Sequence, residues 1–561
     1  MKTKLLFYFI LIFCASTMTA QTLLKDIETL GGNGSSSPSN WCAVTDEIFI
    51  FQANNILETN YLYASDGTEN GTIGLGGYLV DTDIIRLGNH AFFGGCDIFT
   101  SADSCSSLYI SDGTVEGTTF FYDLEPGGLS LGIEDIVAGD NLFYFSGQTN
   151  DSGYELYRSD GTSEGTYRIA DIAAGGLSGY SGELAVIDDI AYFAGFTEEF
   201  GIEAWRSDGT AEGTYMITDL NEGTANAFPS GFTKSGGYIY FSGLGTDSGV
   251  EVRRTNGEEG NIELIGEMGG TTDSSNPRDF VDSDGRLYYA AEGDDVAGYD
   301  LFVYDHVGDP FHIEIAEGDI FPRAIMPFGD GEVIFNAEDD SGRELWRSNG
   351  TIEGTYRIID LYPGAMNGVF ETGAVGESFY MCRDSLVYFA GSDGLNAVGE
   401  FVFELFVSDG TEAGTHIISD QVVGSGGSNP GSFFEFGNRL YFAASDALIG
   451  REPFYLDKEM TNSVSEVMAG ITFSQAPYPN PLPHGSMLTI EMELASSTDI
   501  HAQLFDLTGR PIKNIQNMGH FQAGKCTIQF SPEHYAPDAP GFYTLEISTQ
   551  KSRVSLPIIM E

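Results

Sequence analysis

The stretch "ELYRSDGTSEGTYRIADI" runs from Glu155 to Ile172, and a near copy, "EAWRSDGTAEGTYMITDL", runs from Glu203 to Leu220. The two copies begin 48 residues apart. Related turns recur along the chain at intervals of mostly 44 to 49 residues, beginning at Asp66, Asp112, Asp160, Asp208, Asn349 and Asp409, with worn copies at Asn256, at Asp305–Pro310 and at Asp457. Self-similarity at such a period is typical of repeat architectures, and it indicates nine units between about residues 22 and 468.

Each unit reads as four short strands. In one copy they are "GELAVIDD" (Gly182–Asp189), "IAYFAGF" (Ile190–Phe196), "IEAWRS" (Ile202–Ser207) and "TYMITDL" (Thr214–Leu220). These runs are rich in β-formers and are bounded by Gly, Asp or Ser. Aromatic residues fall on both faces, as expected when each small sheet packs between two others. The sequence therefore predicts an all-β fold, a β-propeller of eight or nine four-stranded blades; eight applies if one unit stands apart.

The turn between the third and fourth strands has a local cause. An Asp or Asn side chain accepts a hydrogen bond from the backbone two residues on, and the Gly that follows tolerates a positive φ. Ring closure needs a link between the first and last blades. The segment "LLKDI" (Leu23–Ile27) resembles the end of a fourth strand but precedes the first unit. We predict that it pairs with the last blade as a clasp.

The repeat resembles a known family. The pattern "ELWRSNGTIEGT" at Glu344–Thr355 is similar to the ELWxxDGT repeats of bacterial surface proteins, and the resemblance covers about four fifths of the chain. It implies a propeller-like all-β architecture and no particular activity. The chain departs from the pattern at Asn256–Gly260 and Asp305–Pro310.

The tail differs from the repeats. A proline-rich linker is expected at 469–486, followed by a small β-sandwich at 487–561 with strands at 487–494, 500–512, 525–530, 541–548 and 553–560. Three motifs, "YPNP" (Tyr478–Pro481), "DLTGR" (Asp506–Arg510) and "GFYTL" (Gly541–Leu545), are similar in order and spacing to the C-terminal sorting domain (type A) of the type IX secretion system of Bacteroidota. The resemblance implies recognition by that machinery, passage across the outer membrane, and surface attachment or release.

The N-terminus has a signal-peptide layout at 1–20: Lys2 and Lys4 precede the apolar run Leu5–Ala15 and a small, polar stretch. The expected cut lies between Ala20 and Gln21, which leaves the propeller at 21–468. We expect Sec export to the periplasm, then a secreted or outer cell-surface location, with no transmembrane segment. In an oxidising compartment Cys96 and Cys105 are a candidate disulfide across a short polar loop.

The composition excludes some partners. The chain has 83 Asp and Glu against 25 Lys and Arg, a formal net charge of -58. Such a surface repels phosphate backbones, so no nucleic-acid partner is expected. Calcium is the one cofactor that the acidity suggests, but "VDSDGR" (Val281–Arg286) and "EDDSGR" (Glu338–Arg343) lack the full calcium-loop spacing and read better as polar hairpin turns.

No catalytic constellation emerges from the sequence. Gly128–Gly132 fits G-x-S-x-G, but it falls in a predicted inter-blade loop rather than at a strand-to-helix elbow. The histidines of the repeats, His90, His306, His312 and His416, are scattered. We therefore predict no catalytic, cofactor-binding or metal-ligating residue, with the His306/His312 pair as surface residues.

Charged residues that recur in the repeat suggest architecture rather than chemistry. Glu155, Glu203, Glu344 and Glu404 share one repeat position, and Arg158, Arg206 and Arg347 share another. We predict carboxylate–guanidinium pairing between neighbouring blades, with any unique function in the departures from the repeat. These are the Cys96–Cys105 loop, the insertion Gly391–Phe403 and the two worn units.

The sequence leaves three functions open. The leading one is a non-catalytic binding or adhesion propeller for a glycan, a matrix polymer or a surface protein. The alternative is a carbohydrate-active or peptide-cleaving propeller enzyme with carboxylates in its channel. The third is a purely structural module. A non-repeated cluster of acid, base and aromatic residues on one rim would favour the enzyme.

Overall fold

The computed structural model describes a chain built of antiparallel β-sheets, and every regular element among its described residues is a strand. The described residues are 21–28, 34–55, 59–99, 107–124, 132–266, 274–293, 298–314, 320–340, 342–362, 367–369, 379–382, 386–392, 394, 402–419, 427–446, 448–457, 471–473, 488–494, 497–505, 516–522, 524–530, 541–548 and 553–560. Within these ranges no helix is long and apolar enough to cross a bilayer. The chain divides into two units, Met1–Lys458 and Glu459–Glu561.

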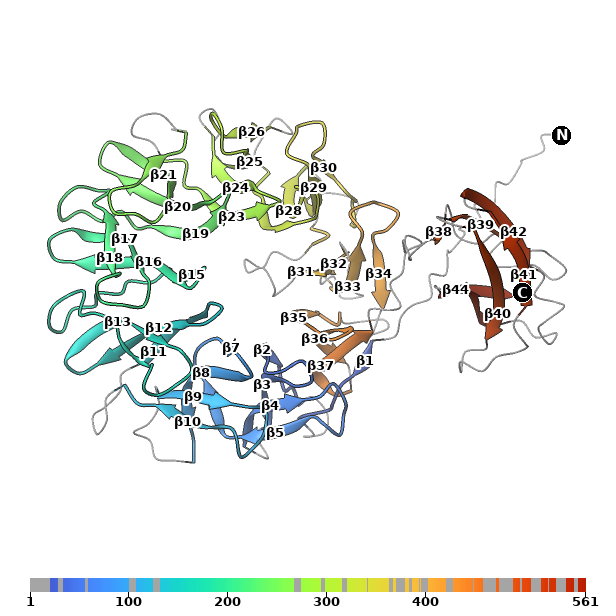
Figure 1. Ribbon diagram of the computed structural model, residues 1–561, viewed down its shortest axis with the longest axis horizontal. Helices are drawn as coiled ribbons and strands as arrows, with labels where there is room; N and C mark the ends of the chain where they lie inside the picture. The colour runs from blue at the N-terminus through green and yellow to red at the C-terminus, as the bar shows by residue number, and fades with distance from the viewer. Residues whose placement is uncertain are drawn as a thin grey trace, which may run out of the picture. The chain divides into compact units, whose positions relative to one another are not determined.

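The first unit is a β-propeller. Its described residues form nine sheets, and in Figure 1 they follow one another around a ring in chain order. The expectation of eight or nine blades is thus resolved as nine, with no unit standing apart.

The strands are short and hold the same place in each blade. The first strands are β2 (Ser39–Ala43), β7 (Ile85–Leu87), β11 (Gly132–Ala138), β15 (Ala185–Ile187), β19 (Ser230–Ser235), β23 (Arg278–Ser283), β27 (Arg323–Pro327), β31 (Phe379–Cys382) and β35 (Gly431–Phe436). The second strands are β3 (Phe49–Asn55), β8 (His90–Asp97), β12 (Phe143–Thr149), β16 (Ile190–Thr197), β20 (Tyr238–Gly245), β24 (Arg286–Glu292), β28 (Val333–Asp339), β32 (Leu386–Gly391) and β36 (Arg439–Asp446).

The outer half of each blade repeats the same order. The third strands are β4 (Asn60–Ser65), β9 (Ser107–Ser111), β13 (Ser152–Ser159), β17 (Gly201–Ser207), β21 (Ser248–Thr255), β25 (Tyr299–Tyr304), β29 (Gly342–Ser348), β33 (Glu404–Ser408) and β37 (Gly450–Asp457). The fourth strands are β5 (Ile73–Gly76), β10 (Thr119–Tyr122), β14 (Tyr167–Arg168), β18 (Tyr215–Thr218), β22 (Glu263–Leu264), β26 (Phe311–Ile313), β30 (Tyr356–Arg357) and β34 (His416–Ser419). First strands such as β15, β19 and β31 lie toward the centre of the ring, and fourth strands such as β18, β26 and β34 toward the outside (Figure 1). Blade 2 carries one more strand, β6 (Tyr78–Val80), which pairs with β8.

The ring closes through its N-terminal segment, as the sequence predicted. Strand β1 (Thr22–Leu23) serves as the fourth strand of blade 9 and pairs antiparallel with β37, with Leu23 opposite Phe454. The backbone amide of Leu24 then donates to the carbonyl of Pro453 at 2.8 Å. The last blade is therefore built from both ends of the propeller.

The hydrophobic core of the propeller is distributed between blades. Nine clusters of buried apolar residues are each shared by two consecutive blades, including blades 9 and 1. At the closing interface, for example, the ring of Trp41 stacks on Phe434 with centroids 6.1 Å apart. Each sheet buries both faces, which explains why aromatic residues do not alternate with polar ones.

The recurring turn forms as predicted. In blade 4 the carboxylate of Asp208 accepts hydrogen bonds from the backbone amide and the hydroxyl of Thr210, at 3.0 and 2.7 Å, and Gly209 has φ +85°. The second glycine has a steric cause: a Cβ on Gly213 would lie 2.1 Å from Oδ1 of Asp208. The same pattern of contacts recurs in the turns that begin at Asp66, Asp112, Asp160, Asn349 and Asp409.

The second unit contains two antiparallel sheets, in line with the predicted sandwich. One sheet has the order β38 (Ile471–Phe473), β39 (Leu488–Leu494) and β42 (Gly524–Phe530); the other has β41 (Gln516–Phe521), β40 (Thr498–Phe505), β43 (Gly541–Ser548) and β44 (Arg553–Met560). Strands β38 and β41 were not foreseen, and β38 falls within the segment expected as linker. The division between the units also comes at Lys458 rather than at residue 468.

Candidate functional site

The repeated glutamate is a buried structural latch. In blade 4 the carboxylate of Glu203 is fully buried and accepts hydrogen bonds from the backbone amides of Leu220 and Asn221, at 2.8 and 3.4 Å. In blade 3 Glu155 accepts from Ile172 and Gly179, both at 3.0 Å. The side chain thus holds the crossover that leaves its own blade for the next, satisfying donors that burial would otherwise leave unpaired.

The same latch recurs around the ring. In blades 5, 7, 8 and 9 the carboxylates of Glu251, Glu344, Glu404 and Glu452 bond to crossover amides in the same way. Burial raises the pKa of Glu155, Glu203 and Glu344 to about 7, against the opposing effect of the amide hydrogen bonds. These carboxyls are thus committed to the fold.

The prediction that the repeated glutamates pair with the repeated arginines of neighbouring blades was wrong. The recurring arginines bond instead to the backbone of the next turn: Arg206 donates to the carbonyl of Gly257 at 3.4 Å and Arg347 to that of Gly410 at 3.3 Å. Arg158 lies 3.6 Å from Asp160 of its own blade. The repeated glutamates meet the amide donors of the crossover, whereas the arginines meet turn carbonyls and acids of their own blade, as in the ion pair of Arg347 with Glu332.

The innermost strands share a local irregularity in most blades. The first strand of most blades carries a β-bulge, for example between Ile133 and Ile136 in blade 3 and between Ser39 and Cys42 in blade 1. Several bulge residues have positive φ, among them Asn40 at 52°. A bulge turns side chains away from the regular ladder, so these positions face new surroundings in each blade.

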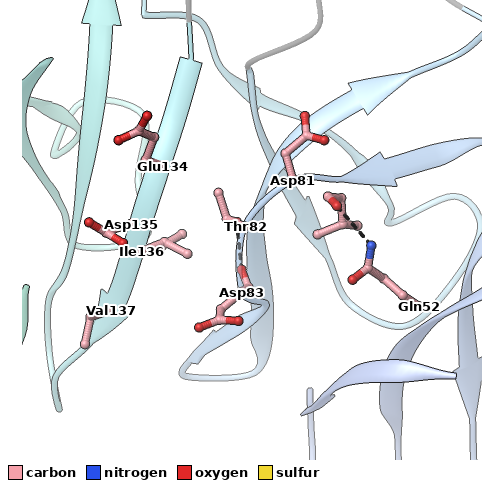
Figure 2. Close-up of a pocket in the computed structure, with 9 residues that line it drawn as sticks. Gln52, Asp81, Thr82, Asp83, Glu134, Asp135, Ile136 and Val137 are labelled. Atoms are coloured by element: carbon pink, nitrogen blue, oxygen red, sulfur yellow. Dashed lines mark hydrogen bonds between the residues drawn. The ribbon is translucent and has the colours of Figure 1, made fainter. Parts of the chain in front are cut away.

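A pocket of about 390 Å³ lies on these irregular segments in blades 1 to 3. It is lined by Gln52, Val80, Asp81, Thr82, Asp83, Glu134, Asp135, Ile136 and Val137. Figure 2 shows the side chains of Glu134 and Asp135 on β11 at one wall, with Asp81, Thr82 and Asp83 at the other. Four of the nine lining residues are acids, and none is basic or aromatic.

The pocket walls are held by hydrogen bonds between blades. Asn40 of blade 1 donates from Nδ2 to the carbonyl of Thr82 at 2.7 Å, and its Oδ1 accepts from the amide of Ile84 at 2.9 Å. Gln52 donates from Nε2 to the carbonyl of Val80 at 3.0 Å. The segment between β6 and β7 is therefore fixed by polar side chains of the preceding blade.

The acids of the pocket differ in their surroundings. Asp135 accepts a 2.5 Å hydrogen bond from the hydroxyl of Tyr180 in blade 4. Burial, together with a hydrogen bond to Glu134, raises the pKa of Tyr154 to about 12. Burial also raises the pKa of Asp81. Asp81, Asp83, Glu134 and Asp135 were not singled out from sequence; Asp83 and Asp135 share their repeat position with Glu183 and Asp279, so the pattern of acids in the repeat did not mark this pocket.

Three features considered in the sequence include residues that the structure does not describe. Ala20 of the expected cut is one such residue, while Gln21 is buried beside β1. Cys105 is another, so the disulfide with Cys96, a buried residue of β8, stays a prediction. Of the G-x-S-x-G stretch only Gly132 is described, at the start of β11.

The histidines do not come together. His306 replaces the turn glycine of blade 6 and its Nδ1 lies 2.8 Å from the hydroxyl of Tyr240, whereas His312 bonds to Asp300 at 2.8 Å. His306 thus bridges blades 5 and 6 rather than standing free on the surface. His90 and His416 are exposed.

Both candidate cation turns are hairpins, as predicted. The first joins β23 to β24 and the second joins β28 to β29. In the first, the carboxylate of Asp284 accepts a hydrogen bond from the amide of Gly331 in the next blade at 2.9 Å. Among the described residues no group of three or more His, Cys, Asp or Glu side chains is arranged to hold a metal ion.

No protein-family model matches the chain, and no curated protein matches it in sequence. Solved structures are similar only at low identity. A puromycin hydrolase is 12% identical, with a TM-score of 0.33, and is matched over 64% of this chain and 57% of its own. Prolyl oligopeptidase B from Galerina marginata is 10% identical (TM-score 0.37; 73% and 54%), and a eukaryotic initiation factor 8% (TM-score 0.39; 88% and 98%). The chain spans just over half the length of the two enzymes.

Proposed function

We propose that this chain is a non-catalytic binding propeller and that the acidic pocket of blades 1 to 3 receives its ligand. The composition of the pocket carries the proposal: four carboxylates stand with one amide, one hydroxyl and three aliphatic side chains. A cluster of carboxylates suits a ligand that carries positive charge or many hydroxyl donors. Two carboxylates can also serve as acid and base or nucleophile in glycoside hydrolysis, so the experiment below tests for catalysis as well as for binding.

The ligand class follows from this lining. Amino sugars of a glycan and lysine or arginine side chains of a matrix or surface protein both present cationic donors, and neutral sugars present hydroxyls. The formal charge of -58 draws cations toward the chain at low ionic strength, but it acts on every cation alike. Selectivity therefore has to come from the fixed geometry of Glu134, Asp135 and the segment 81–83.

The test is a binding panel on the mature protein. Amino-sugar, neutral and uronic oligosaccharides, a lysine-rich peptide and CaCl2 are titrated by calorimetry at 0.15 M salt. We expect binding of a cationic or neutral member, and an affinity about tenfold lower in Asp81→Asn and Glu134→Gln, the loss typical of one charge-assisted hydrogen bond. Glu116→Gln, which removes an exposed acid elsewhere, is the control.

Two outcomes contradict the proposal. Equal affinity in Glu134→Gln and in the wild type removes the pocket from the binding surface. Cleavage of a glycan or peptide that disappears in Glu134→Gln establishes the enzyme alternative. Heat from CaCl2 alone, lost in the same variants, identifies calcium as the ligand.

We also propose that the chain is exported through Sec and then the type IX machinery, on the signal-peptide layout of residues 1–20 and the three tail motifs. The separate second unit, Glu459–Glu561, supports a removable sorting domain. In a host with this system, the full chain is expected on the cell surface or in the medium, and a variant lacking residues 459–561 in the periplasm. Release of the truncated variant at the wild-type level would refute the proposal.

A further inference from the structure

Two arginines stand side by side on the innermost strands of blades 6 and 7. Arg278 is the first residue of β23 and pairs with Ala290; Arg323 is the first residue of β27 and pairs with Asn336. Both precede a bulge at the same repeat position, and β23 and β27 are packed against each other. Burial and then the positive charge of Arg323 lower the pKa of Arg278, which places the two guanidinium groups within electrostatic reach of each other.

Neither guanidinium has an adequate partner. Nε and one terminal nitrogen of Arg278 are buried without a hydrogen bond, and its nearest carboxylate oxygen, Oδ2 of Asp279, is 3.9 Å from Nε. Arg323 is half-buried and forms no hydrogen bond or ion pair with any residue that the structure describes. Elsewhere in the ring the recurring arginines bond to carbonyls or carboxylates. In a chain with 83 acids to 25 bases, two adjacent half-buried arginines for which the structure gives no side-chain hydrogen bond need another explanation.

The surroundings fix one guanidinium in place. The guanidinium carbon of Arg278 lies 3.5 Å from the centroid of the Tyr299 ring, a cation–π contact that holds its plane against the blade. Asp279 next to it has φ +56°, and burial raises the pKa of its carboxyl. Glu292 is the other acid whose charge acts on Arg278, and it bonds to Asn276 at 3.4 Å. Both guanidinium groups act on the carboxyl of Asp279, so the two arginines share this one nearby aspartate.

We propose that Arg278 and Arg323 form a binding site for an oxyanion, the carboxylate or sulfate group of an acidic glycan. The planar fork of a guanidinium matches two oxygens of such a group, and two forks share its charge. Arg278 holds the repeat position that Glu134 of the acidic pocket holds in blade 3, because each lies three residues before the valine, Val281 or Val137, that pairs with a tyrosine of the second strand. The arginine site is separate from that pocket, so one ring wall offers an acidic contact in blades 1 to 3 and a basic contact in blades 6 and 7.

The experiment uses the mature full chain at constant ionic strength. Sodium sulfate and sodium glucuronate are titrated as small probes, and a sulfated, a uronic and a neutral oligosaccharide of equal length as extended ones. We expect the sulfate or carboxylate probes to bind and the neutral one not to bind here. Affinity should fall about tenfold in Arg323→Gln and in Arg278→Gln, the loss of one charge-assisted hydrogen bond. Whichever extended probe binds more tightly identifies the source of the oxyanion.

The control is Arg168→Gln, which removes an exposed arginine from the outer strand β14 and should leave affinity within twofold. If Arg278→Gln unfolds because the cation–π contact is lost, the affinity of Arg323→Gln for the anionic probes tests the proposal. No heat from any anionic probe, or equal affinity in Arg323→Gln and wild type, overturns the proposal. Asp81→Asn should leave oxyanion binding unchanged. The proposal for the acidic pocket and the proposal for the arginine pair are therefore tested independently.

Discussion

Acidic residues of the propeller occur in two contrasting settings. Glu203 is fully buried and both of its oxygens accept backbone amides of the crossover. Glu134 and Asp81 lie on or beside the bulged inner strands and line an open pocket. A side chain that recurs in most blades forms hydrogen bonds that hold the fold together. A side chain that occurs in one blade alone is available to bind a ligand. The difference teaches that function in a repeat protein should be sought where the copies disagree.

The closing latch should be the most sensitive position in the ring. Glu452 accepts hydrogen bonds from the amides of Ile27 and Ser36 and from the hydroxyl of Ser36, at 3.0, 3.1 and 2.6 Å. Glu452→Ala strands these donors and frees β1, so we expect a loss of about 3–6 kcal/mol in the free energy of unfolding. Glu251→Ala removes the equivalent bonds to Ser275 within continuous chain and is the matched control. Denaturant midpoints measure both; equal losses would mean that the clasp does not close the ring.

Substituting a latch glutamate and substituting a pocket acid should have clearly different effects on the free energy of unfolding. Glu203→Ala leaves two buried amides without acceptors, and we expect a loss of about 2–5 kcal/mol. Glu134→Ala should cost less than about 1 kcal/mol, because its side chain lies at a pocket wall. Thermal and urea unfolding of the two variants provides the comparison. A large loss in Glu134→Ala would show that the pocket acids also belong to the fold.

The turn glycines allow a sharper steric test. An added Cβ at Gly213 would meet Asp208 at 2.1 Å, whereas at Gly176 it would meet nothing within 4 Å. Gly213→Ala should therefore destabilise the propeller by about 1–3 kcal/mol, and Gly176→Ala should change stability by less than about 0.5 kcal/mol. Urea midpoints of the two variants decide. If Gly213→Ala is as stable as the wild type, contact with Asp208 is not the reason that the turn has a glycine at this position.

The latches also predict a pH dependence. Burial raises the pKa of Glu203 from its ordinary value of 4.5 to about 7 in the folded chain, so the native state holds the proton more tightly between these values. Stability contributed by this group is complete below about pH 4.5 and is lost as the pH rises to about 7. Glu203→Gln cannot titrate, so its melting temperature should fall less than that of the wild type between pH 5 and 8. Parallel curves would contradict the assignment, since the overall negative charge affects both proteins alike.

The smallest effect on stability is expected at Asp81. Burial raises the pKa of its carboxyl, so the charged form is disfavoured there and Asp81→Asn should shift stability by less than about 1 kcal/mol in either direction. The same variant should weaken ligand binding. A variant that loses stability but keeps binding would reverse the contrast between latch and pocket.

Much of the fold followed from the chain alone. The period, the "DGT" turns and "LLKDI" predicted four-stranded blades, their reversal at Asp208–Gly213 and the clasp, because these depend on local backbone chemistry repeated at fixed spacing. The role of the repeated Glu was predicted only in part. Its recurrence indicated a structural role, but the sequence did not reveal which groups it bonds to. Amides of the next crossover lie 17 and 24 residues away from Glu155, a distance that only packing of the blades closes.

The candidate sites were decided by tertiary structure. Asp81 and Glu134 come from different blades and meet because the ring places bulged strands side by side, and Arg278 and Arg323 are 45 residues apart for the same reason. Sequence by itself determined the blade, since a strand, a turn and a buried face are short-range consequences of residue type. Only closure of nine blades into a ring determined which unrepeated side chains become neighbours, because that proximity is a property of the circle and not of any one unit.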